Sequence, residues 1–419
     1  MIHWPESGAA HLATWAIAAA ATAAVIVRPG RWPEAVWAVA GAVALLVCGL
    51  LSVSTALHAV FEGLDVYLFL TGMMLLSELG RREGLFDTLA GWAVRHAGGS
   101  ARRLFGLTYA IGVVVTVFMS NDATAVVLTP AVYVVAKKAG ARPLPYLFAC
   151  AFIANAASFV LPISNPANLV VFGEHMPPLL AWLRAFALPS MAAIVVTWAV
   201  LVLVFRAELA TPVESVSHVP KLSGTGRLAA LGIAGVVLAM LAASALGFAL
   251  GAPTLIASAV AIGAVQAARR EAPWPLLRHV SWNVLALVAG LFVLVAGIGQ
   301  TGLIAALTEA LRAAAQAAPR TTAWGAGAIV AFVSNLMNNL PAGLVAGTAV
   351  NSGPMPDAVR SAVAIGIDLG PNLSVTGSLA TILWLVALRR EGEHVGAWHF
   401  LRLGALVMPL ALVAALACL

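Results

Sequence analysis

Two aspartates stand where the surrounding sequence is apolar enough to cross a membrane. Asp122 follows Ser120 and Asn121 inside an apolar run that begins at Leu104, and Asp368 lies in a similar run in the second half of the chain. A charged carboxylate at bilayer depth costs roughly 2.5–3.5 kcal/mol even on the lenient insertion scale. No Lys or Arg lies deep in these runs to pair with it. Each carboxyl must therefore be protonated, paired or solvated by a cavity, which suits a group that carries protons or binds solute during transport.

Four polar segments interrupt the apolar runs: SNDAT at 120–124, SNPAN at 164–168, NNLP at 338–341 and GPNLSVTGS at 370–378. Pro removes a backbone donor, Gly permits unusual dihedrals, and Asn, Ser and Thr side chains can replace lost hydrogen bonds. Such breaks at membrane depth are tolerated only where protein or a cavity surrounds them. We therefore predict a polar substrate or ion site, with Asp122 and Asp368 as proton-coupling groups. Its candidate residues are Ser120, Asn121, Asp122, Thr124, Ser164, Asn165, Asn168, Asn338, Asn339, Asp368, Asn372, Thr376, Ser378 and Thr381.

The same residues also have structural interpretations, which the sequence leaves open. Asn121 or Asp122 could cap a short helix over 123–135, and Asp368 could end a broken helix. The other side chains could satisfy backbone groups freed by the breaks or bond back to helix carbonyls. This applies to Ser164, Asn165 and Asn168 in the first half, and to Thr376, Ser378 and Thr381 in the second.

The elements that must position these residues are membrane spans. Hydrophobic residues make up 62% of the chain and charged residues only 10%, which is typical of an all-α polytopic membrane protein. The first apolar run lacks a basic flank and a small-residue cleavage signature, so we interpret it as a retained span and not a signal peptide. Clear spans are predicted at 12–27, 36–57, 66–78, 186–205, 228–250, 255–268, 282–298 and 398–419.

The basic residues indicate how the chain is threaded. We place the N-terminus outside and treat 104–136 and 322–352 as re-entrant hairpins. Of the 23 Lys and Arg residues, only Arg184, Arg312, Arg320 and Arg360 then fall outside, as the positive-inside bias requires. This predicts about ten transmembrane helices in two inverted repeats, each with a re-entrant hairpin and a broken helix. The net charge of +6 is then a topology signal, and no nucleic-acid partner is expected.

A weak internal similarity supports the two repeats. NDATAVVL at 121–128 aligns without gaps on NNLPAGLV at 338–345, and SNPAN falls opposite GSLAT at 377–381. Paired interruptions in inverted repeats are typical of secondary transporters. We therefore predict an N-terminal repeat over 1–205, a cytoplasmic linker loop over 206–227 and a C-terminal repeat over 228–419.

Other classes of protein find little support in the sequence. The chain has no G-x-x-x-x-G-K phosphate loop, no H-E-x-x-H metal motif and no G-x-S-x-G nucleophile motif. Its three cysteines, Cys48, Cys150 and Cys418, are isolated and predict neither a thiol site nor a disulfide framework. We expect no cofactor, no metal centre and no enzymatic activity.

At this point the motifs resemble a family. FMSNDATAVVLTP at 118–130, SNPAN, SNLMNNLPAG at 334–343 and AIGIDLGPNLSVTGSLATILWL at 364–385 are similar to those of the ArsB arsenite and antimonite efflux permeases, in the ion transporter superfamily. The resemblance covers nearly the whole chain. It implies a secondary active transporter in the inner (plasma) membrane that exports arsenite and antimonite from the cytoplasm by proton antiport. Some such permeases also work with a soluble arsenite-stimulated ATPase. The positions that match the family's motifs are Asn121, Asp122, Asn338, Asn339, Asp368, Asn372 and Thr381.

The residues fit that solute, although two other kinds of transporter remain open. Arsenous acid is a small neutral trihydroxide, so its site needs amide and hydroxyl partners and no fixed charge clamp. Sodium/proton exchange is an alternative, because Asp122, Asp368 and nearby carbonyls could coordinate a cation. A dicarboxylate carrier would be expected to keep a Ser-Asn-Thr motif in both halves, and here the motifs are SNPAN and GSLAT.

The sequence also suggests which parts move. We expect the hairpins and broken spans to form a mobile transport unit, and spans 12–57 and 228–268 to form a scaffold or a homodimer surface. Membrane lipid is the expected environment of the whole protein. Amphipathic helices are expected at 85–94 and 303–314, at equivalent positions in the two halves.

Overall fold

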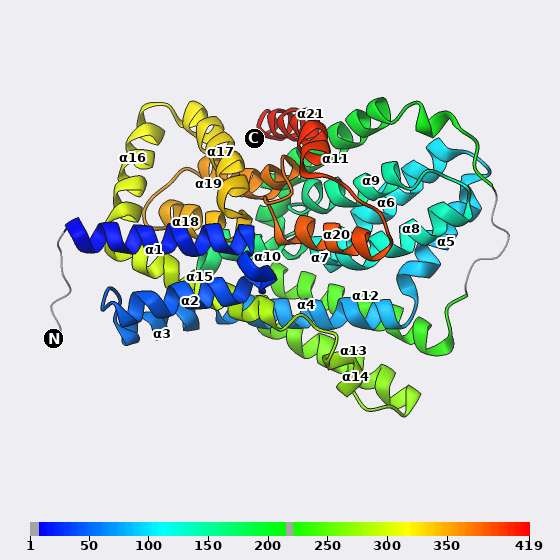
Figure 1. Cartoon of the computed structure of the whole chain (residues 1–419), viewed down its shortest axis with the longest axis horizontal. Helices are drawn as coiled ribbons and strands as arrows, with labels where there is room; N and C mark the ends of the chain where they lie inside the picture. Colours follow the sequence, from blue (N-terminus) through cyan, green and yellow to red (C-terminus); the bar gives the residue numbers. More distant parts are fainter. Residues whose placement is uncertain (1–7, 215–220) are drawn as a thin grey trace.

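The computed structural model describes residues 8–214 and 221–419. Over these residues the fold is all-helical, apart from one isolated β-bridge between Ser100 and Pro212 (Figure 1). Seven described helices are long and apolar enough to cross a membrane, or eight if the bent pair α3 and α4 is one span. The all-α polytopic fold is therefore confirmed. The predicted number of about ten also counted shorter apolar helices.

The described helices form two successive series. The first series consists of α1 (Gly8–Val27), α2 (Glu34–Val47), α3 (Val53–Glu62), α4 (Leu64–Arg82), α5 (Leu85–Ala97), α6 (Ala101–Met119), α7 (Asn121–Ala123), a π-helical segment (Thr124–Leu128), α8 (Thr129–Lys138), α9 (Leu144–Ala156), α10 (Pro166–Phe172) and α11 (Leu179–Val204). The second consists of α12 (Gly224–Ala245), α13 (Gly251–Arg269), α14 (Trp274–Leu277), α15 (Asn283–Gln300), α16 (Leu303–Ala317), α17 (Pro319–Met337), α18 (Asn339–Asn351), α19 (Asp357–Leu369), α20 (Leu379–Arg390) and α21 (Ala397–Leu416). Of the linker at 206–227, residues 215–220 lie outside the described part of the chain.

Corresponding helices in the two series have closely similar lengths and spacing. Helices α6 and α17 each have 19 residues, and they begin 218 positions apart, at Ala101 and Pro319. Helices α9 and α19 each have 13 residues and begin 213 positions apart, at Leu144 and Asp357. The polar breaks that follow these helices therefore fall at equivalent places in the two series.

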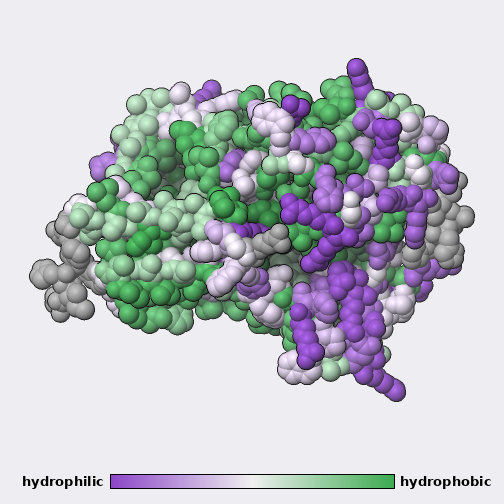
Figure 2. Space-filling model, viewed as in Figure 1, coloured by the Kyte–Doolittle hydropathy of each residue, from purple (hydrophilic) through white to green (hydrophobic). Residues whose placement is uncertain are grey.

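The two series pack into each other through their early helices. Helix α4 packs along α13, and α2 packs along α15. At one end of the first pair, the Gly251 backbone N–H donates to Asp65 Oδ1 at 2.7 Å and so caps α13. At the other end, Arg269 donates to the buried Glu83 carboxylate at 2.7 Å, and Arg82 pairs with Glu271. Hydrophilic residues gather at that end of α4, α13 and α14, at the lower right of Figure 2. Polar contacts therefore join α4 to the α13 segment at both ends of their contact.

One predicted span is wrong. The run at 36–57 is not continuous, because α2 ends at Val47 and α3 begins only at Val53. Gly49 has a φ of +65°, the left-handed conformation that is common just after the end of a helix. Ser52 caps α3, because its hydroxyl accepts a hydrogen bond from the Thr55 backbone N–H at 3.0 Å. A bend of 47° then separates α3 from α4. The prediction of one continuous span relied on the apolar composition and gave too little weight to Gly49 and Ser52.

Glycine allows α17 and α19 to approach closely, and this leads to a stability prediction. A Cβ atom on Gly366 would lie 2.3 Å from the Gly327 carbonyl oxygen. We expect Gly366→Ala to lower the free energy of unfolding by roughly 1–3 kcal/mol, because backbone must shift to make room. The matched control is Gly325→Ala on α17, where a Cβ would meet nothing within 4 Å. Thermal unfolding in detergent should show a lower midpoint for the first variant only. Equal midpoints would contradict this account of the helix contact.

Candidate functional site

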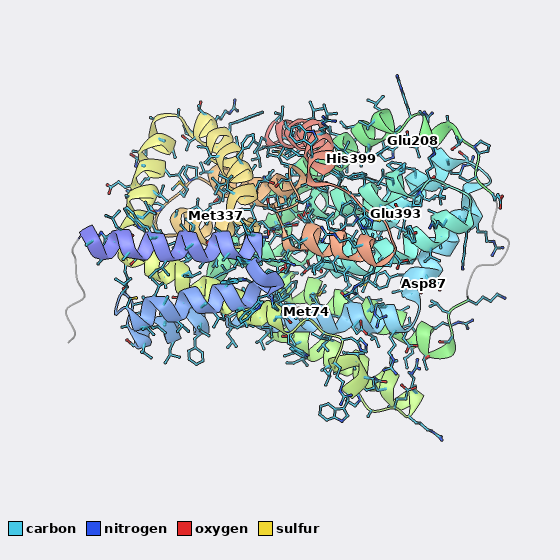
Figure 3. All side chains as sticks on the ribbon, viewed as in Figure 1. Met74, Asp87, Glu208, Met337, Glu393 and His399 are labelled. Carbon is cyan, nitrogen blue, oxygen red and sulfur yellow. The ribbon has the colours of Figure 1, made fainter. Side chains whose placement is uncertain are left out.

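The first and third polar segments each begin at a residue with unusual backbone geometry. Ser120 has φ 85° and ψ 160°, and Asn338 has φ 73° and ψ 153°. Positive φ is uncommon outside glycine, so these residues interrupt the helices sharply. They lie 218 positions apart, at the ends of α6 and α17. Met337, labelled in Figure 3, is the last residue of α17 before the second of these breaks.

These breaks correct the ungapped sequence alignment by one residue. Matching Ser120 to Asn338 pairs Asn121 with Asn339 and Asp122 with Leu340. The alignment instead paired Asn121 with Asn338, because two adjacent Asn residues in NNLP offer two nearly equal matches. The backbone turn decides the register, and it places a carboxylate in the first series where the second has a leucine.

The first break does not use Asn121 or Asp122 as a helix cap. The cap position belongs to Ser120, which makes no side-chain cap bond. Beyond it, the Thr124 hydroxyl lies 2.8 Å from the Thr116 hydroxyl on α6, and Thr124 is fully buried. The capping interpretation of Asp122 is therefore wrong, and Thr124 acts in packing the turn against α6.

The second break joins the two series. Asn165 caps α10, because its Oδ1 accepts a hydrogen bond from the Ala167 backbone N–H at 3.0 Å. Its Nδ2 donates to Asp368 Oδ1 at 2.5 Å, across to α19. Asp368 is fully buried, and its Oδ2 has no hydrogen-bond partner among the described residues. Ser164 and Asn168 instead donate to the backbone carbonyls of Val117 and Ser158, so these two satisfy groups freed by the break.

The last two breaks are tied to each other by their backbones. The Asn339 N–H donates to the Gly377 carbonyl oxygen at 2.8 Å, and Ser378 caps α20 by accepting from the Thr381 N–H at 3.1 Å. Asn372 connects to the first series, since its Oδ1 accepts from Asn155 Nδ2 at 3.0 Å.

Asn335 is a residue of this region that the predicted site omitted. Its Nδ2 donates to the Gly370 carbonyl oxygen at 2.9 Å, and its Oδ1 and backbone carbonyl accept from Ser374 and Thr376. The signal was present in the sequence, because Asn335 opens the same Asn-rich stretch that contains Asn338 and Asn339.

A narrow cleft lies where the four breaks meet, with a cavity volume of about 20 Å³. Its polar lining comes from five of the fourteen predicted residues, and its apolar lining includes Leu70 and Val284. Most of the lining consists of residues at equivalent places in the two series. These pairs are Asn121 with Asn339, Asp122 with Leu340, Asn165 with Ser378 and Pro166 with Leu379.

The polar lining of the cleft combines three amides, one hydroxyl and one carboxylate. Asp122 is its one ionisable lining residue, and no Lys, Arg or His lines it. In the described part of the chain, the Asp122 carboxylate accepts no hydrogen bond, and the buried Asn121 Oδ1 likewise has no partner. A solute with several O–H donors, or a cation, would satisfy these oxygens.

The other nine predicted residues do not line the cleft. Asp368 lies behind Asn165, and Asn338 lines a neighbouring pocket. The remaining seven form part of the breaks or pack beside them. They are Ser120, Thr124, Ser164, Asn168, Asn372, Thr376 and Thr381.

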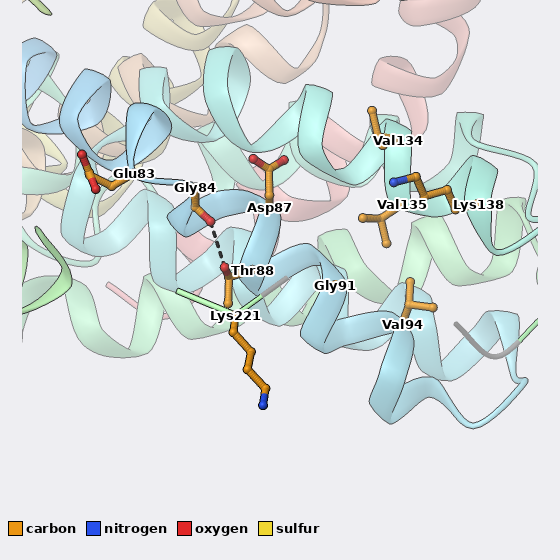
Figure 4. A pocket seen from close by; sticks show the side chains of 10 residues that line it. All are labelled: Glu83, Gly84, Asp87, Thr88, Gly91, Val94, Val134, Val135, Lys138 and Lys221. Carbon is orange, nitrogen blue, oxygen red and sulfur yellow. Dashed lines mark hydrogen bonds between the residues drawn. The ribbon is translucent and has the colours of Figure 1, made fainter. Parts of the chain in front are cut away.

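A separate cavity of about 270 Å³ lies between α5, α8 and the start of the segment leading to α12 (Figure 4). Its lining includes Glu83, Asp87, Lys138 and Lys221, and it shares no residue with the cleft. Its lining carries both charges, whereas the lining of the cleft carries one ionisable residue, Asp122.

Comparison with known proteins agrees with this architecture. The chain is 27% identical over 359 residues to an arsenical pump membrane protein of Yersinia enterocolitica, and 29% identical over 369 residues to one of Escherichia coli K12. In each case the match covers 83% of this chain and 84% of the relative. The resemblance to arsenical efflux permeases is thereby confirmed.

Solved transporters share the fold. The YdaH transporter of Alcanivorax borkumensis matches with a TM-score of 0.57 at 16% identity, covering 87% of this chain and 86% of that one. Neisseria gonorrhoeae MtrF, described as an antimetabolite efflux pump, matches with a TM-score of 0.55 at 12% identity, covering 87% and 82%. The protein is a multi-pass membrane transporter. Residues 19–366 match the family described as citrate transporter, so this chain belongs to the citrate transporter (CitMHS) family.

Proposed function

We propose that this protein exports arsenite and antimonite from the cytoplasm across the inner (plasma) membrane in exchange for protons. The observation that carries the proposal is the cleft, in which amides, one hydroxyl and one carboxylate surround a small space without any basic lining residue. Arsenous acid offers three O–H donors and no charge, so it complements acceptors such as Asn121 Oδ1. The names of the arsenical pump relatives support the same solute.

The composition of the cleft argues against citrate, in spite of the family's description. Citrate carries several carboxylates, and proteins bind carboxylates with Arg, Lys or clusters of N–H donors. The cleft lining has neither Arg nor Lys, and Asp122 would repel an anion. A neutral hydroxylated solute fits these residues better.

Within this proposal the site residues have different tasks. The cleft-lining residues Asn121, Asp122, Asn165, Asn339 and Ser378 contact the solute. Asp122 exchanges the coupling proton, and Asp368 acts through Asn165, which it holds in place. The helix series support two inverted repeats, over 1–205 and 228–419, joined by a cytoplasmic loop at 206–227.

Everted membrane vesicles test the proposal, because their cytoplasmic face is outside. With an acid interior, we expect labelled arsenite to accumulate in vesicles that contain the protein and not in vesicles that lack it. An ionophore that collapses the pH gradient should abolish accumulation, and no ATP should be needed. If arsenite never accumulates but added sodium releases protons from the vesicles, the protein is a cation exchanger. Gradient-driven uptake of citrate would contradict the argument from the lining.

A further inference from the structure

A second, small pocket of about 10 Å³ adjoins the cleft, and two leucines form the boundary. It is bordered by Glu34 at the start of α2, Leu287 on α15, Asn338 before α18 and Ile382 on α20. Leu340 and Leu379 line both this pocket and the cleft, and no other residue does. These side chains are 7% and 8% exposed, so they fill the space between the two.

The two boundary leucines lie at the starts of two helices that follow polar breaks. Leu340 follows the sharp turn at Asn338, and Leu379 is the first residue of α20. The two segments are joined by the hydrogen bond from the Asn339 N–H to the Gly377 carbonyl oxygen. A small change at either break would therefore move both leucines, whereas a boundary within a long helix would require the helix itself to shift.

The far side of the second pocket reaches the connection between α1 and α2. Glu34 lines the pocket and pairs with Arg28, which lies just beyond the end of α1. Arg28 belongs to the set of basic residues that the threading places on the cytoplasmic side. The pocket thus leads from the expected cytoplasmic face toward the cleft.

We propose that this pocket is the cytoplasmic vestibule through which solute reaches the cleft, and that Leu340 and Leu379 are the barrier that must part. The vestibule takes a small, neutral, hydroxylated solute, because Asn338 and Glu34 can exchange hydrogen bonds with O–H groups while its other walls are apolar. A hydrated anion would lose its water shell between two leucines without finding a basic partner. The solute and the direction of travel rest on the proposed function, whereas the route does not.

Cysteine labelling in everted vesicles tests the route without arsenite. In a chain whose three native cysteines are replaced, Ile382→Cys reports on the vestibule and Ala380→Cys on the cleft. We expect a membrane-impermeant maleimide to label the first readily and the second slowly. Adding Leu340→Ala should speed labelling at 380 by about tenfold or more, because most of the side chain that fills the boundary is removed. The matched control is Leu336→Ala, whose side chain on α17 is 76% exposed and should leave the rate unchanged.

Two outcomes would overturn the proposal. One is that Ile382→Cys reacts in right-side-out vesicles and not in everted ones. The other is that labelling at 380 stays slow in both Leu340→Ala and Leu379→Ala, each verified as folded by its elution in size-exclusion chromatography. If Leu340→Ala does not fold, Leu340→Val and Leu379→Ala carry the same test. Because the labelling needs no solute, it can succeed where arsenite transport fails, so the two proposals are tested separately.

Discussion

Replacing Asp122 by Asn is expected to abolish arsenite accumulation driven by a pH gradient while leaving the protein folded. The carboxylate faces the cleft and accepts no hydrogen bond from the described residues, so an amide of the same shape disturbs little of the structure. It removes the one ionisable group in the lining, and with it the proposed proton carrier. The expected uptake in acid-loaded everted vesicles is that of vesicles without the protein.

A second assay separates the two tasks assigned to Asp122. Exchange of labelled for unlabelled arsenite, with no gradient, needs solute binding but no net proton movement. Retained exchange in Asp122→Asn would assign the residue to coupling alone, and lost exchange would make it a solute contact as well. The control is Asp87→Asn on α5, an exposed carboxylate that lines the separate charged cavity. Undiminished gradient-driven accumulation in Asp122→Asn would show that the coupling group lies elsewhere.

Replacing Asn165 by Ala is expected to impair both stability and transport. The change removes the cap of α10, which is worth about 1 kcal/mol, and leaves the buried Asp368 carboxylate without its donor, which costs roughly 1–3 kcal/mol more. We expect a lower unfolding midpoint in detergent and loss of most gradient-driven uptake.

Asn165→Ser distinguishes the two contributions of this side chain. Serine is a good helix cap, but its shorter side chain lacks the amide that reaches Asp368. Part of the stability should therefore return, while uptake stays low. If serine restored uptake fully, the contact between Asn165 and Asp368 would be structural only, and its place in the transport site would be wrong.

Much of the fold could be predicted from residue types. Apolar runs of sufficient length identified most of the long helices, and Asn, Pro and Gly inside those runs marked the breaks. These features are local, since a helix interrupted by Ser120 or Asn338 must show a change of composition there. The break between α2 and α3 was also local, with Gly49 and Ser52 as its signals, but the high hydrophobicity around them outweighed both.

What could not be predicted depends on contacts between distant segments. The sequence shows Asn165 and Asp368 as two candidates 203 residues apart, and only the packing of α10 against α19 makes them partners. Similarly, Leu340 and Leu379 look like ordinary core residues in the sequence. Their role as a shared wall follows from where the two breaks meet.

The matched positions around the cleft carry different residues in the two helix series. A chain built from two copies of the first series would place a second carboxylate opposite Asp122 and a second proline opposite Pro166, in place of Leu340 and Leu379. It would concentrate like charges in one small space and have no apolar wall toward the neighbouring pocket. Under the proposed roles, the first helix series supplies the carboxylate at these positions and the second supplies the apolar wall, so we expect that neither half could replace the other.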